Sequence, residues 1–269
     1  MKGAIIGDIV GSIYEFDNLK SKDFELFKSE CEFTDDSVLT VAIAEALLKH
    51  NPEIETEFKE NLIDIFHKYG EMYPDVGYGG HYLSWVENKR REPYNSCGNG
   101  SAMRASALGW YAKSIEECEN LAKVCAEITH NHPDGIAGAQ ATAGVIFLAR
   151  NGASKDELKT YMEKYYPIDF TVDEIRPTYE YEIINKTTVP QAFQCFYEAT
   201  DFEDAIRNAI SIGGDSDTVA AITGSMAEAF FDIPKDLSET GMSYLDDYMN
   251  EVVEKFYNNF IRLIKISNM

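Results

Sequence analysis

The chain has 269 residues, 45% of them hydrophobic, and a formal net charge of −22 at pH 7. This length and composition favour a globular protein with a sizeable core. The charge disfavours general binding to nucleic acids or anionic lipid surfaces, and any anionic ligand would need local positive charge.

Cysteine usage and the apolar runs indicate an intracellular protein. The five cysteines include no CxxC spacing, so they indicate buried thiols rather than a disulfide framework or a zinc knuckle. Asp8 interrupts the apolar N-terminal stretch and no small-residue cleavage site follows it, which argues against a secretion signal. No run reaches the roughly 18 to 20 apolar residues of a membrane span. We therefore expect a cytoplasmic protein without membrane contact.

The first predicted helix carries Gly3, Gly7 and Gly11 at four-residue intervals, in register with Glu15. Each glycine costs a helix roughly 1 kcal/mol relative to alanine. Three glycines on one face predict that a ligand or another backbone approaches closely, and plain helix-on-helix contact explains the pattern equally well. Glu15 would place a carboxylate at the end of this groove, or would simply be a solvated residue at a helix end.

Two adjacent carboxylates, Asp35 and Asp36, follow Thr34 at the start of the next predicted helix. Helix capping alone explains such a cluster, because the exposed amides and the helix dipole favour threonine and aspartate there. Like charges this close also repel each other unless one is protonated or a cation lies between them. Carboxylate and hydroxyl oxygens are hard donors that suit Mg²⁺ or Mn²⁺.

The segment "SCGNGSAMR" begins at Ser96 and contains two glycines ahead of a helix that we predict to start near Ser101. Gly98 and Gly100 would expose backbone amides, which makes the segment a candidate anion cradle, although an ordinary turn and cap explain it as well. Arg104 would then supply positive charge or pair with an acid.

His130 and His132 lie two residues apart in "THNHPDG". No cysteine or third histidine accompanies them, so a zinc site is disfavoured. A polar contact to a ligand and a helix-capping role are the remaining interpretations.

A second acidic cluster, Asp215, Asp217 and Thr218, opens the predicted helix within "GGDSDTVAAITGS". If the two acidic helix starts face each other, four carboxylates and two hydroxyls converge on a volume that can hold two divalent ions. The pairing of the clusters, rather than either cluster alone, predicts a binuclear metal site.

Apolar residues recur at helical spacing through most of the chain and strand signals are scarce, which predicts an all-α fold. Beyond the first helix we predict helices over residues 38–49, 57–69, 101–112, 115–129, 136–150, 191–199, 203–212, 218–230 and 244–265. The stretch 167–190 is the least helical and predicts a long loop near the ligand. No linker or repeat interrupts the pattern, so we expect a single domain over residues 1–269.

The order of the motifs "GDIVGSIYEF", "FTDDSVLT", "SCGNGSAMR", "THNHP" and "GGDSDTVAAITGSMAEAFF" resembles the ADP-ribosylglycohydrolase family, the DraG-like enzymes. These motifs extend from residue 3 to about residue 231. The resemblance implies an all-α orthogonal multi-helix bundle with two Mg²⁺ or Mn²⁺ ions in a cleft. It also implies hydrolysis of the glycosidic bond between ADP-ribose and an acceptor, either a protein side chain or a small molecule as in O-acetyl-ADP-ribose.

The resemblance implies roles for individual residues as well. The metal ligands would be Thr34, Asp35, Asp36, Asp215, Asp217 and Thr218. ADP-ribose would be held by Ser96, Gly98, Asn99, Gly100 and His130. The catalytic candidates are Glu15, Asp35 and Asp36, one of which would act as general base or acid. Ser37 stands where many relatives carry a second threonine.

Two other functions are compatible with these residues. A non-catalytic relative would bind ADP-ribose without turnover, although this chain keeps all six implied ligands and Glu15. A binuclear phosphohydrolase would cut the pyrophosphate instead, but the sequence has no Nudix-like glutamate cluster and no histidine-rich phosphoesterase motif. The motifs specify neither the acceptor nor the oligomeric state.

Overall fold

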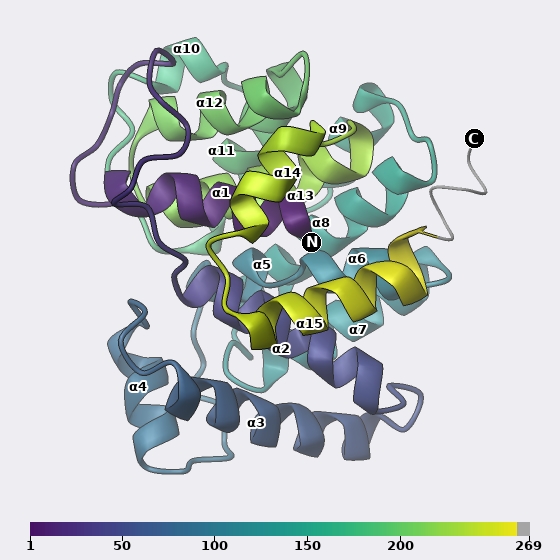
Figure 1. Ribbon diagram of the computed structural model, residues 1–269. Helices are drawn as coiled ribbons and strands as arrows, with labels where there is room; N and C mark the ends of the chain where they lie inside the picture. Colours follow the sequence, from purple (N-terminus) through teal and green to yellow (C-terminus); the bar gives the residue numbers. More distant parts are fainter. Residues whose placement is uncertain (263–269) are drawn as a thin grey trace.

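A computed structural model describes residues 1–262, which form helices joined by loops (Figure 1). Within this range there is no β-strand, and the β-type pairing consists of one isolated antiparallel bridge between Gly98 and Ile184. The all-α prediction is therefore confirmed. None of the helices in residues 1–262 is long and apolar enough to cross a membrane.

The helices cross one another in several directions and share one hydrophobic core (Figure 1). Their bounds are α1 Lys2–Gly11, α2 Asp35–Lys49, α3 Glu55–Met72, α4 Gly80–Glu87, α5 Gly100–Met103, α6 Ser106–Tyr111, α7 Ile115–Glu127, α8 Pro133–Arg150, α9 Lys155–Met162, α10 Val172–Ile175, α11 Asn185–Glu198, α12 Phe202–Ile212, α13 Ser216–Phe230, α14 Lys235–Met242 and α15 Asp247–Phe256. A 3₁₀ turn, Ser12–Tyr14, follows α1, and a π-helical turn, Tyr257–Ile261, follows α15.

Several predicted helices have wrong bounds. The helix predicted over 101–112 is two helices, because Arg104 leaves helical geometry at φ −94° and ψ 5° between α5 and α6. The loop predicted over 167–190 contains α10 and the start of α11, which continues through Pro190. The helix predicted over 244–265 becomes a π-helical turn after α15, and residues 263–265 lie outside the described range. The helices α4, α9 and α14 were not predicted.

The glycine face of α1 packs directly on the backbone of α13. A Cβ added at Gly7 would lie 2.0 Å from the carbonyl oxygen of Ala220, and one added at Gly3 would lie 2.1 Å from that of Gly224. The close approach predicted from the glycine spacing is therefore a contact between helices. The register does not continue to Glu15, since α1 ends at Gly11.

A buried carboxylate, Glu45, joins α2 to α3 and α15. It accepts hydrogen bonds from the Tyr69 hydroxyl at 2.5 Å, the Tyr248 hydroxyl at 2.7 Å and Lys68 Nζ at 3.0 Å. Lys49 Nζ forms a further ion pair with it. This network fixes the orientation of α2, whose first turn lies at the site described below.

Candidate active site

A cavity of about 460 Å³ opens where the first turns of α2, α5 and α13 meet. All of the site residues named from the sequence line it: Glu15, Thr34, Asp35, Asp36, Ser96, Gly98, Asn99, Gly100, His130, Asp215, Asp217 and Thr218. The two acidic clusters, which are far apart in the sequence, thus share one cavity.

The first cluster is held by the start of α2. Thr34 is the N-cap residue, and its Oγ1 accepts a hydrogen bond of 3.3 Å from the amide of Asp36. Thr34 therefore caps α2, as the capping interpretation states, and it also lines the cavity. Asp35 donates its amide to Val76 O at 2.8 Å, so the loop before α4 fixes its backbone.

Asp8, in the middle of α1, is a buried member of the site that sequence reasoning missed. Its carboxylate accepts hydrogen bonds from the Thr34 amide at 3.0 Å, the Thr34 hydroxyl at 2.6 Å and the Ser37 amide at 3.0 Å. The first amides of a helix have no partner within that helix, and Asp8, on the neighbouring helix α1, accepts hydrogen bonds from two amides at the start of α2. An aspartate inside an apolar, glycine-rich helix was the available signal, because a buried carboxylate needs partners.

The second cluster lies at the start of α13, after a turn formed by Gly213 and Gly214. Both glycines have positive φ, +70° and +79°, which other residues rarely adopt. Asp215 is the N-cap residue without a capping side-chain bond, and Asp217 Oδ1 accepts the Thr218 amide at 2.9 Å. The turn leaves the Asp215 carboxylate available for contacts across the cavity.

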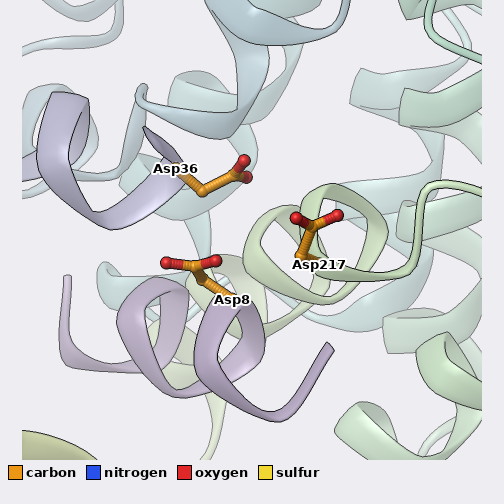
Figure 2. A group of neighbouring side chains, drawn as sticks. All are labelled: Asp8, Asp36 and Asp217. Atoms are coloured by element: carbon orange, nitrogen blue, oxygen red, sulfur yellow. The ribbon is translucent and has the colours of Figure 1, made fainter. Parts of the chain in front are cut away.

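Two groups of carboxylates result, each with one oxygen per residue lying within 4.8 Å of the others. Asp8, Asp36 and Asp217 form the first group, and Figure 2 shows their side chains projecting from three helices toward a common volume. Glu15, Asp215 and Asp217 form the second group, so Asp217 belongs to both. Asp35 lines the cavity but belongs to neither group.

Burial and mutual repulsion raise the pKa values of these carboxyl groups. Desolvation is the largest cause for Asp36 and Asp217, and the charges of neighbouring aspartates add to it. Asp36 Oδ1 is buried and has no hydrogen-bond partner among the described residues. A divalent cation would relieve both the repulsion and the missing contact, and the oxygen donors fit Mg²⁺ or Mn²⁺.

In the glycine-rich segment before α5, two backbone amides already have partners within the protein. The amide of Gly98 donates to Ser96 Oγ at 3.0 Å, and the amide of Asn99 donates to Ile183 O at 2.8 Å. The glycines instead leave room beside His130, since a Cβ at Gly100 would lie 3.2 Å from His130 Nε2. The Asn99 side chain donates to Asp215 Oδ2 at 2.6 Å, which links this segment to the second acidic cluster.

His130 and Arg104 share one hydrogen-bond partner, Thr129. His130 Nδ1 lies 2.8 Å from Thr129 Oγ1, and Arg104 Nη2 donates to the same oxygen at 2.8 Å. Burial and the nearby guanidinium hold the pKa of His130 well below its usual value, so its ring is neutral near pH 7. Arg104 pairs with no carboxylate in residues 1–262, and its guanidinium lies over the Phe66 ring. His132 instead caps α8.

An exposed aromatic pair, Phe16 and Tyr181, lies beside Glu15, and Tyr181 also lines the cavity. Phe16, 84% exposed, stacks on Tyr181 with ring centroids 5.9 Å apart. The Tyr181 hydroxyl donates to Glu15 Oε1 at 3.0 Å. Burial and the charge of Asp215 raise the pKa of Glu15, while the Tyr181 hydrogen bond opposes that rise. Tyr181 lies in the stretch that the sequence predicted to be near the ligand, but its contact with Glu15 had no sequence signal.

The chain is similar to known proteins along most of its length. The chain is 24% identical to ADP-ribosylhydrolase ARH3 of Mus musculus, in an alignment that covers 86% of this chain and 82% of that protein. It is 27% identical to ADP-ribosylarginine hydrolase Tri1 of Serratia proteamaculans, with 87% and 71% covered. A solved structure named as an ADP-ribosylglycohydrolase-related protein complex superposes with a TM-score of 0.70 at 21% identity, covering 95% of this chain and 94% of that one.

A family model described as ADP-ribosylglycohydrolase matches residues 1–262, the whole range that the structure describes. The resemblance inferred from the motif order is thereby confirmed, and the chain belongs to the ADP-ribosylglycohydrolase family.

Proposed function

We propose that this protein is a metal-dependent hydrolase that cleaves the glycosidic bond between ADP-ribose and an acceptor. The observation that carries the proposal is the meeting of Asp8, Asp36 and Asp217, one oxygen of each lying within 4.8 Å of the others, with Asp36 Oδ1 buried and unpartnered within residues 1–262. Repelling carboxylates and an unpartnered oxygen cost folding free energy, which a bound cation would offset. Relatives named as hydrolases of ADP-ribosyl groups support the substrate class.

The proposed cofactors are two Mg²⁺ or Mn²⁺ ions. Their ligands would be Thr34, Asp35, Asp36, Asp215, Asp217 and Thr218. When bound, such ions neutralise carboxylate charge, attract an anionic pyrophosphate and lower the pKa of a coordinated water. Asp8 would hold Thr34 in place through the hydrogen bonds that its two oxygens accept, and it would add negative charge beside the ions.

Glu15 is the proposed general base or acid. It is half-buried, it belongs to the second carboxylate group, and burial together with the charge of Asp215 raises its pKa above the usual value for a glutamate. In the reaction, a water oxygen bonds to the anomeric carbon as the bond from that carbon to the acceptor breaks. The proton lost by the water passes to Glu15, which later releases it to solvent, and the departing acceptor takes up one proton from solvent, so that protons balance over the reaction. Asp35 and Asp36 are the other catalytic candidates.

ADP-ribose would bind along Ser96, Gly98, Asn99, Gly100 and His130. The two glycines provide space, since side chains there would crowd Ser96 and His130. The neutral His130 ring would offer a hydrogen bond to a phosphate or hydroxyl oxygen. Arg104, a buried cation on the same cavity wall, would favour the anionic pyrophosphate in a protein of net charge −22.

The test is a panel of ADP-ribosylated arginine, ADP-ribosylated serine and O-acetyl-ADP-ribose, each incubated with Mg²⁺, with Mn²⁺ and with chelator. We expect at least one substrate to release intact ADP-ribose with metal and none to do so with chelator. AMP as the product would instead identify a pyrophosphatase. Binding of ADP-ribose without turnover of any substrate would identify a non-catalytic relative, and either result would refute the proposal.

A further inference from the structure

Asn18 lies three residues after Glu15, and its carboxamide contacts two segments of the site. Nδ2 lies 2.9 Å from Tyr14 O and 3.0 Å from Glu15 O, which are the carbonyls of the segment that carries the proposed base. The same nitrogen lies 3.0 Å from Gly214 O, and Oδ1 accepts the Gly214 amide at 2.7 Å. One side chain therefore joins the Glu15 segment to the turn that precedes Asp215.

The turn that receives Asn18 depends on close packing. A Cβ added at Gly213 would lie 2.8 Å from Asn18 Oδ1, and one added at Gly214 would lie 2.4 Å from Tyr179 Cε1. Asn18 and Tyr179 thus enclose the two-glycine turn. Because Asp215 is the next residue and caps α13, the position of this turn sets where the second acidic cluster begins.

We propose that Asn18 is a positioning residue, which holds the backbone of Glu15 in register with Asp215 and Asp217. The inference rests on the proposed function, in which Glu15 transfers a proton beside this carboxylate group. Asn18 does not line the cavity, and within residues 1–262 its side chain forms hydrogen bonds to main-chain atoms alone, so its effect on the reaction passes through Glu15. Displacements of about 1 Å at a reacting centre cost up to roughly 100-fold in rate.

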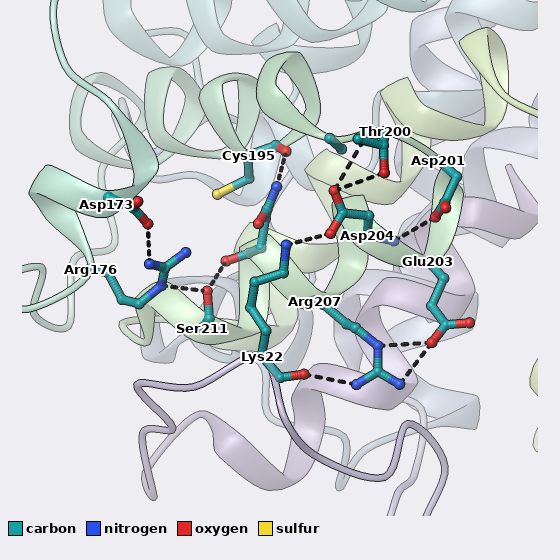
Figure 3. Close-up of polar contacts among 12 residues, drawn as sticks. Lys22, Asp173, Arg176, Cys195, Thr200, Asp201, Glu203, Asp204, Arg207 and Ser211 are labelled. Carbon is teal, nitrogen blue, oxygen red and sulfur yellow. Dashed lines mark hydrogen bonds and ion pairs between the residues drawn. The ribbon is translucent and has the colours of Figure 1, made fainter.

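The loop that follows Asn18 has its own attachment to the fold. Figure 3 shows Lys22 paired with Asp204 and Arg207 donating to the carbonyl oxygen of Lys22. Arg207 also donates to Phe24 O at 2.8 Å. Asn18 itself is exposed. Substituting Asn18 should therefore loosen the connection between Glu15 and the glycine turn without releasing the whole loop from α12.

The experiment measures kcat and KM for Asn18→Ala, Asn18→Asp and the wild-type protein at saturating metal. We expect kcat to fall about tenfold or more in both variants, with KM and ADP-ribose affinity within about threefold. Asn18→Asp keeps the acceptor for the Gly214 amide but loses the donors to three carbonyl oxygens. The matched control is Asp17→Ala, since Asp17 is exposed and makes no hydrogen bond or ion pair within residues 1–262; it should retain wild-type kcat.

A double-mutant cycle with Glu15→Gln separates positioning from general stability. If Asn18 acts through Glu15, Asn18→Ala should lower kcat further by less than about twofold in the Glu15→Gln background. Multiplicative losses, or a kcat equal to wild type in both Asn18 variants, would overturn the inference while leaving the proposed function standing. Failure of the wild-type protein to release ADP-ribose would instead refute the proposed function itself.

Discussion

The hydroxyl of Thr218 donates a hydrogen bond of 3.1 Å to Oδ2 of Asp36, a residue 182 positions earlier in the chain. This contact joins the first turn of α13 to the first turn of α2. The other oxygen, Asp36 Oδ1, has no hydrogen-bond partner in residues 1–262, and the Asp36 side chain points toward the volume shared with Asp8 and Asp217 (Figure 2). The two acidic clusters form one site because of this contact and the helix packing beneath it.

Asp36→Asn should weaken Mg²⁺ binding and reduce kcat/KM by at least about 100-fold, because it replaces an anionic oxygen at the centre of the carboxylate group. Calorimetry with Mg²⁺ and an assay of ADP-ribose release measure the two effects. Asp169→Asn is a suitable control, since Asp169 is exposed and does not line the cavity. Full turnover by Asp36→Asn would exclude the proposed metal site.

Removing divalent metal should make stability depend on pH. Desolvation and repulsion raise the pKa values of Asp36 and Asp217 above those in the unfolded chain, so the metal-free folded state binds more protons. The metal-free protein therefore keeps its full free energy of unfolding below the unfolded pKa near 4. This free energy falls as pH rises through the raised pKa values of the folded state. We expect the Tm gap between Mg²⁺ and chelator samples to widen from pH 5 to pH 8. A constant gap would contradict this electrostatic account.

Tyr181→Phe should change the pH profile of kcat/KM. The Tyr181 hydroxyl stabilises the ionised form of Glu15, so its loss should raise the pKa of Glu15 beyond the rise that burial causes. If Glu15 is the general base, the acidic limb of the profile moves to higher pH. Tyr197→Phe is the matched control, because the Tyr197 hydroxyl donates to Asp156 at 3.0 Å outside the cavity. Identical profiles for all three proteins would argue against Glu15 as the titrating base.

Gly7→Ala should destabilise the fold by about 3 kcal/mol or prevent folding, because the added Cβ would overlap the Ala220 carbonyl oxygen on α13. Urea unfolding followed by circular dichroism measures the loss. Gly80→Ala is the control, since a Cβ there meets nothing within 4 Å. Equal stability of the two variants would show that α1 and α13 pack less closely than described.

The Glu45 network should contribute to acid denaturation. Burial alone would raise the pKa of Glu45, but hydrogen bonds from Lys49, Tyr69, Tyr248 and Lys68 outweigh it and lower the pKa to about 2. The stabilisation is present above the unfolded pKa near 4.5 and is lost as pH falls toward 2. Glu45→Gln should therefore be less stable than wild type at pH 7 and lose less stability between pH 5 and pH 3. An unchanged acid profile would contradict this assignment.

The sequence predicted the helices and the cavity residues for different physical reasons. Apolar periodicity located α2, α7 and α12, but it carries through the break at Arg104 because the spacing of buried residues continues across that turn. The helices α9 and α14 have only eight residues each, which is too short for an apolar repeat to be clear, so periodicity did not reveal them.

The site required information that local patterns lack. Thr34 and Asp215 lie at helix starts, as their residue types indicate, and the two clusters line one cavity, while the metal site predicted from their pairing stays a prediction. Asp8 was missed because its partners lie 26 and 29 residues away, in another helix. Asn18 and Tyr181 were missed for the same reason, since each contact joins segments that only the folded chain brings together.

The contact between α1 and α13 has a consequence for the ions that the site can accept. Asp8 and Asp217 project from these two helices, and a Cβ at Gly11 would lie only 2.4 Å from the Cα of Asp217. The close contact of the two main chains therefore limits how far apart Asp8 and Asp217 can move. Asp8 places its negative charge beside the proposed ligand Asp217 at this limited separation, so the glycine contact would favour small divalent cations such as Mg²⁺ or Mn²⁺ at the site.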